Sequence, residues 1–294
     1  MVQTTLELAN EEMEQGHEVC IRQPSTEESI FGHIEKPDVH CIHTQLGRSA
    51  YYDGVPKFFW AHGEPLLSVG NRQSMKGILE LATHCEAFIC MREEEQQIWK
   101  HIKKTFVVPK GISLKRFRPI PGVVEKLEGE PAVLYIENWR GQRNPLYLCV
   151  AMAEVWKRYP KAKLHLYNCT DEKMFEIFQM LRESCQWFPF FSSLCGTVED
   201  LNLLYNRCDI VVSCLHPLYA RSIECFGAGK PLICPGYKVD DYPHTCDLDP
   251  SDMARAIMAC WEQSGSWDFR KWAEEHHDVS ETVKQSIAIY ERYL

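Results

Sequence analysis

The chain has 294 residues, about twice the usual single-domain length of roughly 150, so two domains of ordinary size are expected. Apolar residues make up 45% of it and charged residues 25%, a balance that excludes a disordered, collagen-like or low-complexity protein. The formal net charge of −9 argues against a protein that coats nucleic acid, and any polyanion would need a local basic site.

The fourteen cysteines are scattered from Cys20 to Cys260 without a Cys-x-x-Cys pair, and many sit in apolar runs such as Ala87–Cys90. This usage is typical of reduced core cysteines. No apolar stretch approaches the roughly 20 residues that cross a bilayer, and Met1–Gln15 has the pattern of an acidic helix rather than of a signal peptide. We therefore expect a cytoplasmic protein without a transmembrane segment, which leaves room for peripheral binding at a membrane face.

Short apolar or aromatic runs alternate with stretches of helical period along the chain, which is the pattern of βαβ units and predicts an α/β fold with parallel sheets. The first half is expected to form one sheet. Its predicted elements, in chain order, are the helix Thr4–Gln15, the strands His17–Arg22, Val39–His43 and Lys57–Ala61, the helix Ser74–Thr83, the strand Ala87–Met91, the helix Glu93–Lys103 and the strand Thr105–Val108.

The second half starts a new series of strands and helices. The predicted strands are Ala132–Glu137, Lys163–Tyr167, Phe190–Leu194, Ile210–Ser213 and Pro231–Cys234. The predicted helices are Leu146–Arg158, Glu172–Ser184, Val198–Arg207, Ser222–Ala228, Pro250–Gln263 and a terminal helix Val279–Leu294. His276 and His277 are expected to form a solvated helix end.

A polar stretch, Ser113–Gly129, contains Pro119 and Pro121 and predicts the connection between two domains. We place a first Rossmann-like domain at 1–118 and a second at 119–270. Two doubly wound parallel sheets in series favour a ligand in the cleft that they face, at the carboxyl ends of their strands.

The most informative segment is Ser222–Ile233, directly after an apolar strand pattern. The segment predicts a short helix with Glu224 on its first turn, followed by a glycine turn into a buried strand. The carboxylate of Glu224 would then present an acceptor suited to ribose or sugar hydroxyls. The alternative is structural: a glutamate favoured by the helix dipole, with glycines that only permit the turn. The segment alone leaves both interpretations open.

Further segments follow one another in a recognisable order. They are Leu8-Ala9 with Gly16-His17-Glu18-Val19, Lys36–Val39 leading to His43, Gly54-Val55-Pro56 leading to His62-Gly63, Val107–Ser113 leading to Phe117-Arg118-Pro119, and Glu224-Cys225 with Gly229-Lys230-Pro231. Together they resemble glycosyltransferases of the GT-B fold, in particular the large retaining group called family 4, whose hallmark reads E-x7-E-A-x-x-x-G-x-P. The resemblance runs over nearly the whole chain, and it implies that residues 271–294 cross back to the first domain.

The resemblance implies a hexosyltransferase that moves a sugar from a nucleotide-sugar, of which we favour a UDP-sugar, to an acceptor hydroxyl with retention and without a metal. Glu224 would bind the ribose, and Arg143, helped by Arg140, would neutralise the diphosphate. The further donor-side candidates are Asn138, Gly196, Thr197, Val198, His216, Ser222 and Ile223. Two positions depart from the family: His216 stands where the hallmark has its first glutamate, and Asn138 stands where the family has an arginine. An imidazole cannot supply the two acceptor oxygens of a carboxylate, which puts the sugar selectivity in doubt.

His62 matches the family's histidine near the donor sugar, although a histidine at a strand end beside a glycine is also a common structural residue. His43, Gly63 and Lys110 are weaker, acceptor-side candidates. His40 and Cys41 would suit a metal, but no further ligand pair has the spacing of a zinc site, so no metal is expected.

Seven basic residues and no acidic one lie between Lys100 and Arg118. They would suit an anionic acceptor, either a lipid phosphate or DNA, or they form a solvated surface.

Family members also begin with a strand and a glycine loop, whereas this chain starts at the helix. The open alternatives are a binding protein for nucleotide-sugars without transferase activity and a transferase that acts on modified bases of viral DNA.

Overall fold

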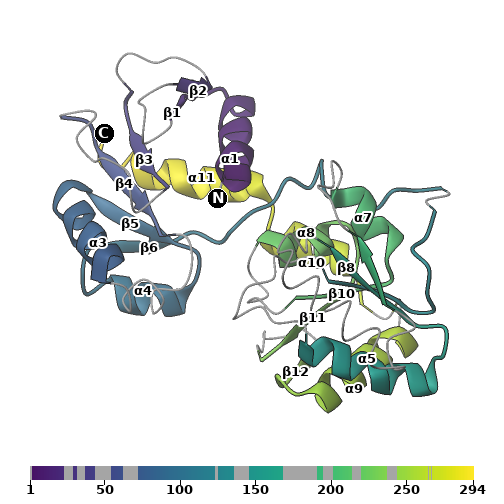
Figure 1. The fold of residues 1–294 in the computed structure, drawn as a ribbon. Helices are drawn as coiled ribbons and strands as arrows, with labels where there is room; N and C mark the ends of the chain where they lie inside the picture. The colour runs from purple at the N-terminus through teal and green to yellow at the C-terminus, as the bar shows by residue number, and fades with distance from the viewer. Residues whose placement is uncertain are drawn as a thin grey trace. The chain divides into compact units, whose positions relative to one another are not determined.

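The computed structural model describes residues 2–22, 29–31, 37–43, 54–61, 72–122, 125–135, 146–167, 191–194, 201–213, 220–236, 244–263, 265 and 267–294. It divides the chain into two compact units (Figure 1). Unit 1 comprises Met1–Ser113 and His276–Leu294, and unit 2 comprises Leu114–Glu275. The chain thus passes between the units at residues 113/114 and 275/276, a few residues from the expected positions 118 and 270.

Unit 1 contains a parallel sheet in which the strands follow one another in chain order, β3-β4-β5-β6. The strands are β3 (His40–Ile42), β4 (Lys57–Trp60), β5 (Ala87–Cys90) and β6 (Thr105–Val107). The two central strands, β4 and β5, are buried along their whole length. This burial explains why they were recognisable as short uninterrupted apolar runs, since a parallel strand is covered on both faces.

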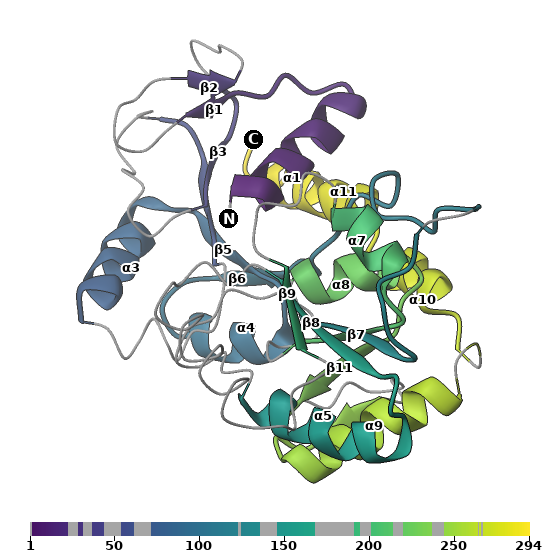
Figure 2. The same cartoon turned by 45° about the vertical axis from the view of Figure 1, so that its right-hand side comes forward.

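Helices cover both faces of this sheet (Figure 2). They are α1 (Val2–Glu14) and α11 (Val279–Tyr290) on one face, and α3 (Arg72–His84) and α4 (Glu93–Trp99) on the other. Phe58 and Trp60 pack into the cluster that contains Leu8 of α1 and Val283 of α11, whereas Phe59 packs with Ile78 of α3. Successive side chains of β4 therefore serve opposite faces, as the strand period requires.

One predicted strand of unit 1 is wrong. Within His17–Arg22 only Ile21–Arg22 forms a strand, β1, and it pairs antiparallel with β2 (Ser29–Phe31) in a separate two-stranded sheet. His17 and Glu18 are exposed, and Gly16, at φ +94°, ends the helix before them. An exposed segment cannot take a place in a sheet that is buried on both faces, which is why it does not join β3–β6.

Unit 2 contains a six-stranded parallel sheet in the order β12-β11-β10-β7-β8-β9. Its strands are β7 (Ala132–Tyr135), β8 (Lys163–Tyr167), β9 (Phe191–Leu194), β10 (Ile210–Val212), β11 (Leu232–Pro235) and β12 (Thr245–Cys246). β12 was not predicted. The expected helix Glu172–Ser184 lies outside the described residues. Two parallel sheets with helices on both faces confirm the α/β class.

The helices of unit 2 also lie on both sides of their sheet (Figure 1). They are α5 (Leu146–Arg158) and α9 (Pro250–Glu262) on one face, and α7 (Leu201–Arg207) and α8 (Ala220–Gly227) on the other, with α10 (Phe269–His276) against α8. Met152 of α5 and Ile257 of α9 share one core cluster with Val133 and Val212 of the sheet. On the other side, the rings of Phe226 and Trp272 lie 5.0 Å apart and join α8 to α10.

Candidate functional site

The donor-side candidates of the sequence follow the carboxyl ends of three parallel strands of unit 2. β7 ends at Tyr135, β9 at Leu194 and β10 at Val212. Because the strands are parallel, these ends share one edge of the sheet, the edge at which open α/β folds bind ligands. The candidates that come directly after them, Asn138, Arg140, Arg143, Gly196, Thr197, Val198 and His216, lie outside the described residues.

Glu224 is the donor-side candidate whose surroundings the structure defines best. It lies on α8, which starts at Ala220 rather than at the expected Ser222. The glutamate is therefore the fifth residue of the helix and not part of its first turn. Because the helix dipole acts mainly on the first turn, it does not account for a carboxylate at this position.

The Glu224 carboxylate is buried inside unit 2, with only 2% of the residue exposed. The hydroxyl of Tyr205 on α7 donates a hydrogen bond of 3.1 Å to its Oε2 atom. A carboxylate can accept about four hydrogen bonds through two oxygens, which is the capacity that makes it suited to vicinal hydroxyls. The neighbouring candidates Ser222 and Ile223 are fully buried, and their side chains are part of the protein interior.

Tyr205 was missed by the sequence analysis. Its ring is fully buried and lies edge-on to Phe117, with 6.2 Å between the ring centroids. The only signal for it in the sequence is a tyrosine on the buried face of a short helix, where a hydroxyl usually needs a polar partner. Nothing in the spacing of Tyr205 and Glu224 identifies that partner, because the two residues belong to different helices.

The predicted glycine turn after α8 is formed by Gly229, which has φ +73°. Its amide donates to the carbonyl of Phe226 at 2.8 Å, and the amide of Lys230 donates to the carbonyl of Cys225 at 2.9 Å. A β-carbon at Gly229 would lie 3.3 Å from the ring of Pro119. The positive φ and the close approach both favour glycine here, and the turn fixes the end of the helix that carries Glu224.

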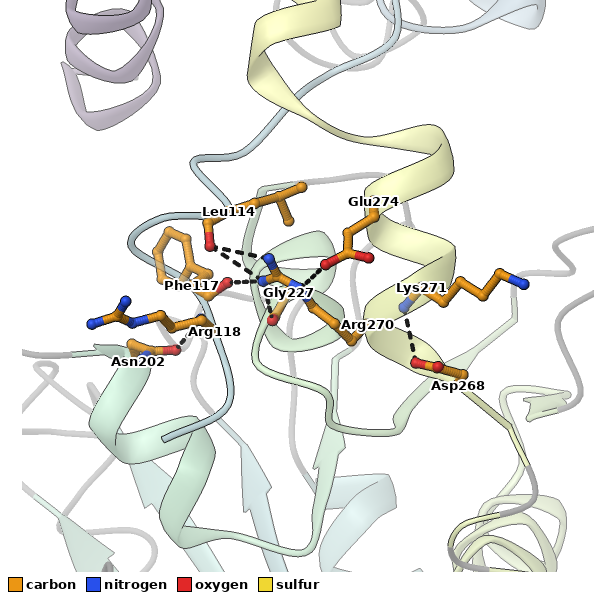
Figure 3. Close-up of polar contacts among 9 residues, drawn as sticks. All are labelled: Leu114, Phe117, Arg118, Asn202, Gly227, Asp268, Arg270, Lys271 and Glu274. Atoms are coloured by element: carbon orange, nitrogen blue, oxygen red, sulfur yellow. Dashed lines mark hydrogen bonds and ion pairs between the residues drawn. The ribbon is translucent and has the colours of Figure 1, made fainter. Parts of the chain in front are cut away.

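Arg270 of α10 holds the same helix end and the chain segment that enters unit 2 (Figure 3). Its Nη1 atom donates to the carbonyl oxygens of Phe117 at 2.6 Å, Gly227 at 2.8 Å and Leu114 at 3.2 Å. Its Nε atom pairs with Glu274 at 2.6 Å. One guanidinium group therefore joins α10 to two other parts of unit 2, the segment 114–117 and the end of α8, through their backbone carbonyls.

In unit 1, His43 follows the carboxyl end of β3, and its ring stacks on Trp60 with 5.5 Å between centroids and 18° between planes. Burial, reinforced by the nearby His40, lowers the pKa of His43 to about 4. The imidazole is therefore neutral at pH 7 and can act only as a hydrogen-bonding group. His62 and Gly63, the other candidates of this unit, lie outside the described residues.

A group of polar side chains lies under Trp60, between the sheet and the helices α1 and α11. The indole Nε1 of Trp60 donates to the hydroxyl of Tyr290 at 3.0 Å. Burial raises the pKa of the Glu12 carboxyl to about 7 and that of the Cys41 thiol to about 12. Cys41 is therefore protonated at neutral pH, as expected for a reduced core cysteine, while Glu12 titrates close to pH 7.

The expectation of a solvated helix end at His276 and His277 is wrong for His277. His276 is the exposed last residue of α10, but His277 is 5% exposed and its Nδ1 atom lies 2.9 Å from the carbonyl oxygen of Lys110. The amide of Ile112 also donates to the carbonyl of His277 at 2.9 Å. The returning chain pairs with 110–112, and this pairing buries the histidine. Lys110 contributes its backbone to the contact.

The basic run divides between the two units. Lys100, Lys103, Lys104 and Lys110 belong to unit 1, and Lys115, Arg116 and Arg118 belong to unit 2.

The described residues contain no group of three or more His, Cys, Asp or Glu side chains placed to hold a metal ion. None of the described helices combines the length and the apolar character that crossing a bilayer requires.

Solved structures with the same arrangement of sheets and helices identify the fold. The chain superposes on Anabaena Alr3699/HepE in complex with UDP-glucose with a TM-score of 0.68 and 18% identity, covering 87% of this chain and 79% of that one. The chain has the GT-B fold. A glycosyltransferase from Rickettsia africae gives a TM-score of 0.65 at 13% identity, with 87% and 76% covered.

A third GT-B structure, S. aureus TarM with fondaparinux, α-GlcNAc-glycerol and UDP, gives a TM-score of 0.61 at 15% identity, covering 82% of this chain and 52% of TarM. No protein-family model matches the chain, and no curated protein matches it. At identities this low, the GT-B likeness establishes the fold, and the activity has to be argued from the residues.

Proposed function

We propose that the chain is a glycosyltransferase that moves a sugar from a nucleotide-sugar to an acceptor hydroxyl. The observation that carries this proposal is Glu224, a buried carboxylate on α8, the helix that comes after the carboxyl end of β10 in the chain. Open α/β sheets bind nucleotides at the carboxyl ends of their strands. HepE with UDP-glucose and TarM with UDP support uridine diphosphate as the nucleotide. A UDP-sugar is therefore the favoured donor.

The proposed roles follow from chemistry. Glu224 accepts hydrogen bonds from the ribose hydroxyls, and Arg143, with Arg140, pairs with the diphosphate, since guanidinium groups bind phosphate oxygens bidentately. Backbone amides at 196–198 meet the base. When the bond between the sugar and the diphosphate breaks, negative charge grows on the departing group, and cations fixed beside it stabilise that charge without a metal.

The sugar-binding part departs from the family pattern. His216, with His62, would face the sugar in place of a carboxylate, and a neutral imidazole offers one donor and one acceptor rather than two acceptor oxygens. We infer that the preferred sugar differs from those held by a glutamate at this position. Retention of the anomeric configuration is carried over from the resemblance to family 4.

Thermal unfolding with a panel of nucleoside diphosphates and their sugars tests the proposal, followed by hydrolysis of the donor that stabilises most. Saturating ligand at about 100 times its Kd should stabilise the folded chain by roughly 2.7 kcal/mol, which is readily measured. Stabilisation by one donor together with slow hydrolysis supports a working enzyme. No shift with any nucleotide would overturn the proposal.

The second candidate is a protein that binds nucleotide-sugars without transferring the sugar. It is favoured by His216 and Asn138, which replace a glutamate and an arginine of the family pattern. Thermal stabilisation without hydrolysis or transfer, at any acceptor concentration, would favour it. If the chain is an enzyme, Glu224→Ala should abolish turnover, and the variant should lose the stabilisation by the donor as well.

A further inference from the structure

The contact between Tyr205 and Glu224 has a consequence for how the nucleotide is recognised. We propose that Tyr205 is a positioning residue, which holds the Glu224 carboxylate in the orientation that the two ribose hydroxyls require. This inference rests on the proposed function, because it assigns a task to a residue that would act on the nucleotide only through Glu224. It makes Tyr205 a determinant of the preference for ribose over deoxyribose.

The Glu224 carboxylate needs a partner that limits its conformational freedom. A glutamate side chain has three rotatable bonds, so its oxygens point to a ligand only if something restricts them. The phenol of Tyr205 has a single proton to donate, and it donates that proton to Oε2 over 3.1 Å. Because the acceptor is buried, water does not readily replace the phenol, and the bond restricts where Oε2, and with it the carboxyl group, can lie.

Contacts on either side of Tyr205 hold its helix, α7, in place. Two asparagines on the same helix, one turn apart, bind the segment that enters unit 2. The Oδ1 atom of Asn202 accepts from the amide of Arg118 at 2.9 Å (Figure 3). The Oδ1 atom of Asn206 accepts from the amide of Ile120, also at 2.9 Å. Together with the Phe117 ring, which lies against Tyr205, these contacts hold α7 and the Tyr205 hydroxyl in place.

Arg270 links the surroundings of the two helices α7 and α8. Arg270 binds the carbonyl of Gly227, at the end of α8, and the carbonyl of Phe117, whose ring supports Tyr205. One guanidinium group therefore contacts both the end of the helix that carries Glu224 and the residue whose ring lies against Tyr205. Figure 3 shows these two contacts of Arg270. Sites that recognise a ligand through a few polar groups need this kind of support behind the residue that touches the ligand.

A positioning role makes a selective prediction. The Tyr205 hydroxyl should contribute to binding only when the ligand has ribose hydroxyls for Glu224 to meet. A residue that merely stabilises the fold of unit 2 would affect every nucleotide equally. The comparison of UDP with 2′,3′-dideoxy-UDP separates these cases, because the two ligands differ only in the hydroxyls.

The experiment measures the Kd of both ligands by calorimetry for the whole chain and for Tyr205→Phe, which keeps the ring and its packing on Phe117. We expect Tyr205→Phe to weaken UDP about tenfold, the effect of losing one hydrogen bond to a charged group, and to leave 2′,3′-dideoxy-UDP unchanged. Tyr159→Phe is the matched control, since Tyr159 also donates to a glutamate of unit 2, Glu262, at 2.6 Å but on the exposed surface. It should change neither Kd.

Equal weakening of both ligands by Tyr205→Phe, or no weakening of either, would overturn the assignment. If the unchanged chain binds neither ligand, the proposed function fails, and this inference fails with it. Phe117→Leu gives an independent reading if Tyr205→Phe folds poorly, because it keeps the hydroxyl and removes the ring that supports it. It should reduce the affinity for UDP more than that for the dideoxy ligand, and an equal reduction would count against the proposal.

Discussion

His277 and Lys110 are 167 positions apart in the sequence, yet the Nδ1 atom of one lies 2.9 Å from the carbonyl oxygen of the other. The contact joins the two passages of the chain that flank unit 2. Both passages belong to unit 1, where a parallel bridge between Ile112 and Asp278 continues the pairing. The C-terminal helix α11 starts directly after this bridge, and the side chain of Asp278 caps it by accepting from the amide of Ser280.

The burial of His277 predicts that acid destabilises unit 1. Burial lowers its pKa from 6.5 to about 4, an effect that the hydrogen bond to Lys110 opposes and the charge of His276 reinforces. The unfolded chain therefore binds a proton between pH 6.5 and 4 that the folded chain does not, and stability falls as the pH falls through this window. We expect a loss of about 2 kcal/mol between pH 7 and pH 5 from this residue.

Urea unfolding of the chain and of His277→Asn, at both pH values, checks this prediction. The amide of asparagine can donate to the Lys110 carbonyl but does not titrate, so the variant should lose that part of the pH dependence. His43 has a similarly lowered pKa and contributes to both proteins alike, so it cancels in the comparison. Identical slopes in the two proteins would show that His277 is not buried as a neutral group.

Substitutions of two neighbouring residues of α10, Arg270 and Lys271, should change the free energy of unfolding very differently. In Arg270→Lys, a single ammonium group cannot reach the carbonyls of Leu114, Phe117 and Gly227 together, so buried acceptors lose their donors. We expect the free energy of unfolding to fall by about 2 to 4 kcal/mol. Lys271→Gln removes an exposed cation whose nearest acid, Glu275, is 3.8 Å away, and should cost less than about 1 kcal/mol. Chemical denaturation of both variants measures the difference, and equal effects would contradict the role given to Arg270.

Gly111 is required by close packing rather than by backbone conformation. A β-carbon there would lie 2.4 Å from the α-carbon of Val279 and 2.5 Å from the hydroxyl of Thr282. Because the nearest atom is backbone, Gly111→Ala must displace the start of α11, and we expect a cost of about 3 kcal/mol or more. Gly265→Ala is the comparison, since Gly265 has φ +95° and open space around it. It should cost about 1 to 2 kcal/mol from backbone strain alone. Thermal unfolding of both variants checks the order.

The parts of the fold that sequence predicts well are those that local pattern determines. The strands Lys57–Trp60, Ala87–Cys90 and Ala132–Tyr135 are apolar throughout except at Lys57, because they are buried on both faces, and their positions agree closely with the predictions. For the helix Phe269–His276 only an end at His276 and His277 was expected, without a range, because only Phe269 and Ala273 of its residues are buried and its apolar pattern is correspondingly short. The strand expected at His17–Arg22 shows the opposite error, since an apolar triplet does not reveal which sheet it joins.

The candidate site also contains residues that a local sequence pattern indicates and residues that it does not. Glu224 could be found because it lies in a segment with its own local pattern, a short helix followed by a glycine turn. Tyr205, Phe117 and Arg270 could not, because their contacts join different elements of the fold. Tyr205 binds Glu224, Phe117 packs against Tyr205, and Arg270 binds the carbonyl of Gly227. The burial of His277 likewise depends on a partner at Lys110 that no local pattern indicates.

The last prediction concerns the hydrogen bond between the Trp60 indole and the Tyr290 hydroxyl. Trp60 is 4% exposed and Tyr290 7%, so water does not readily replace the tyrosine as acceptor. Tyr290→Phe keeps the ring that packs 4.7 Å from Phe58 but removes the hydroxyl, and the indole N–H loses the partner it has on α11. We expect a loss of about 1 to 3 kcal/mol, the cost of a buried donor without its acceptor. Tyr147→Phe, in a residue that is 49% exposed on α5, should change stability by less than about 0.5 kcal/mol. Chemical denaturation of both variants measures the change in stability. A Tyr290→Phe variant as stable as the unchanged chain would show that the bond does not hold α11 to the sheet.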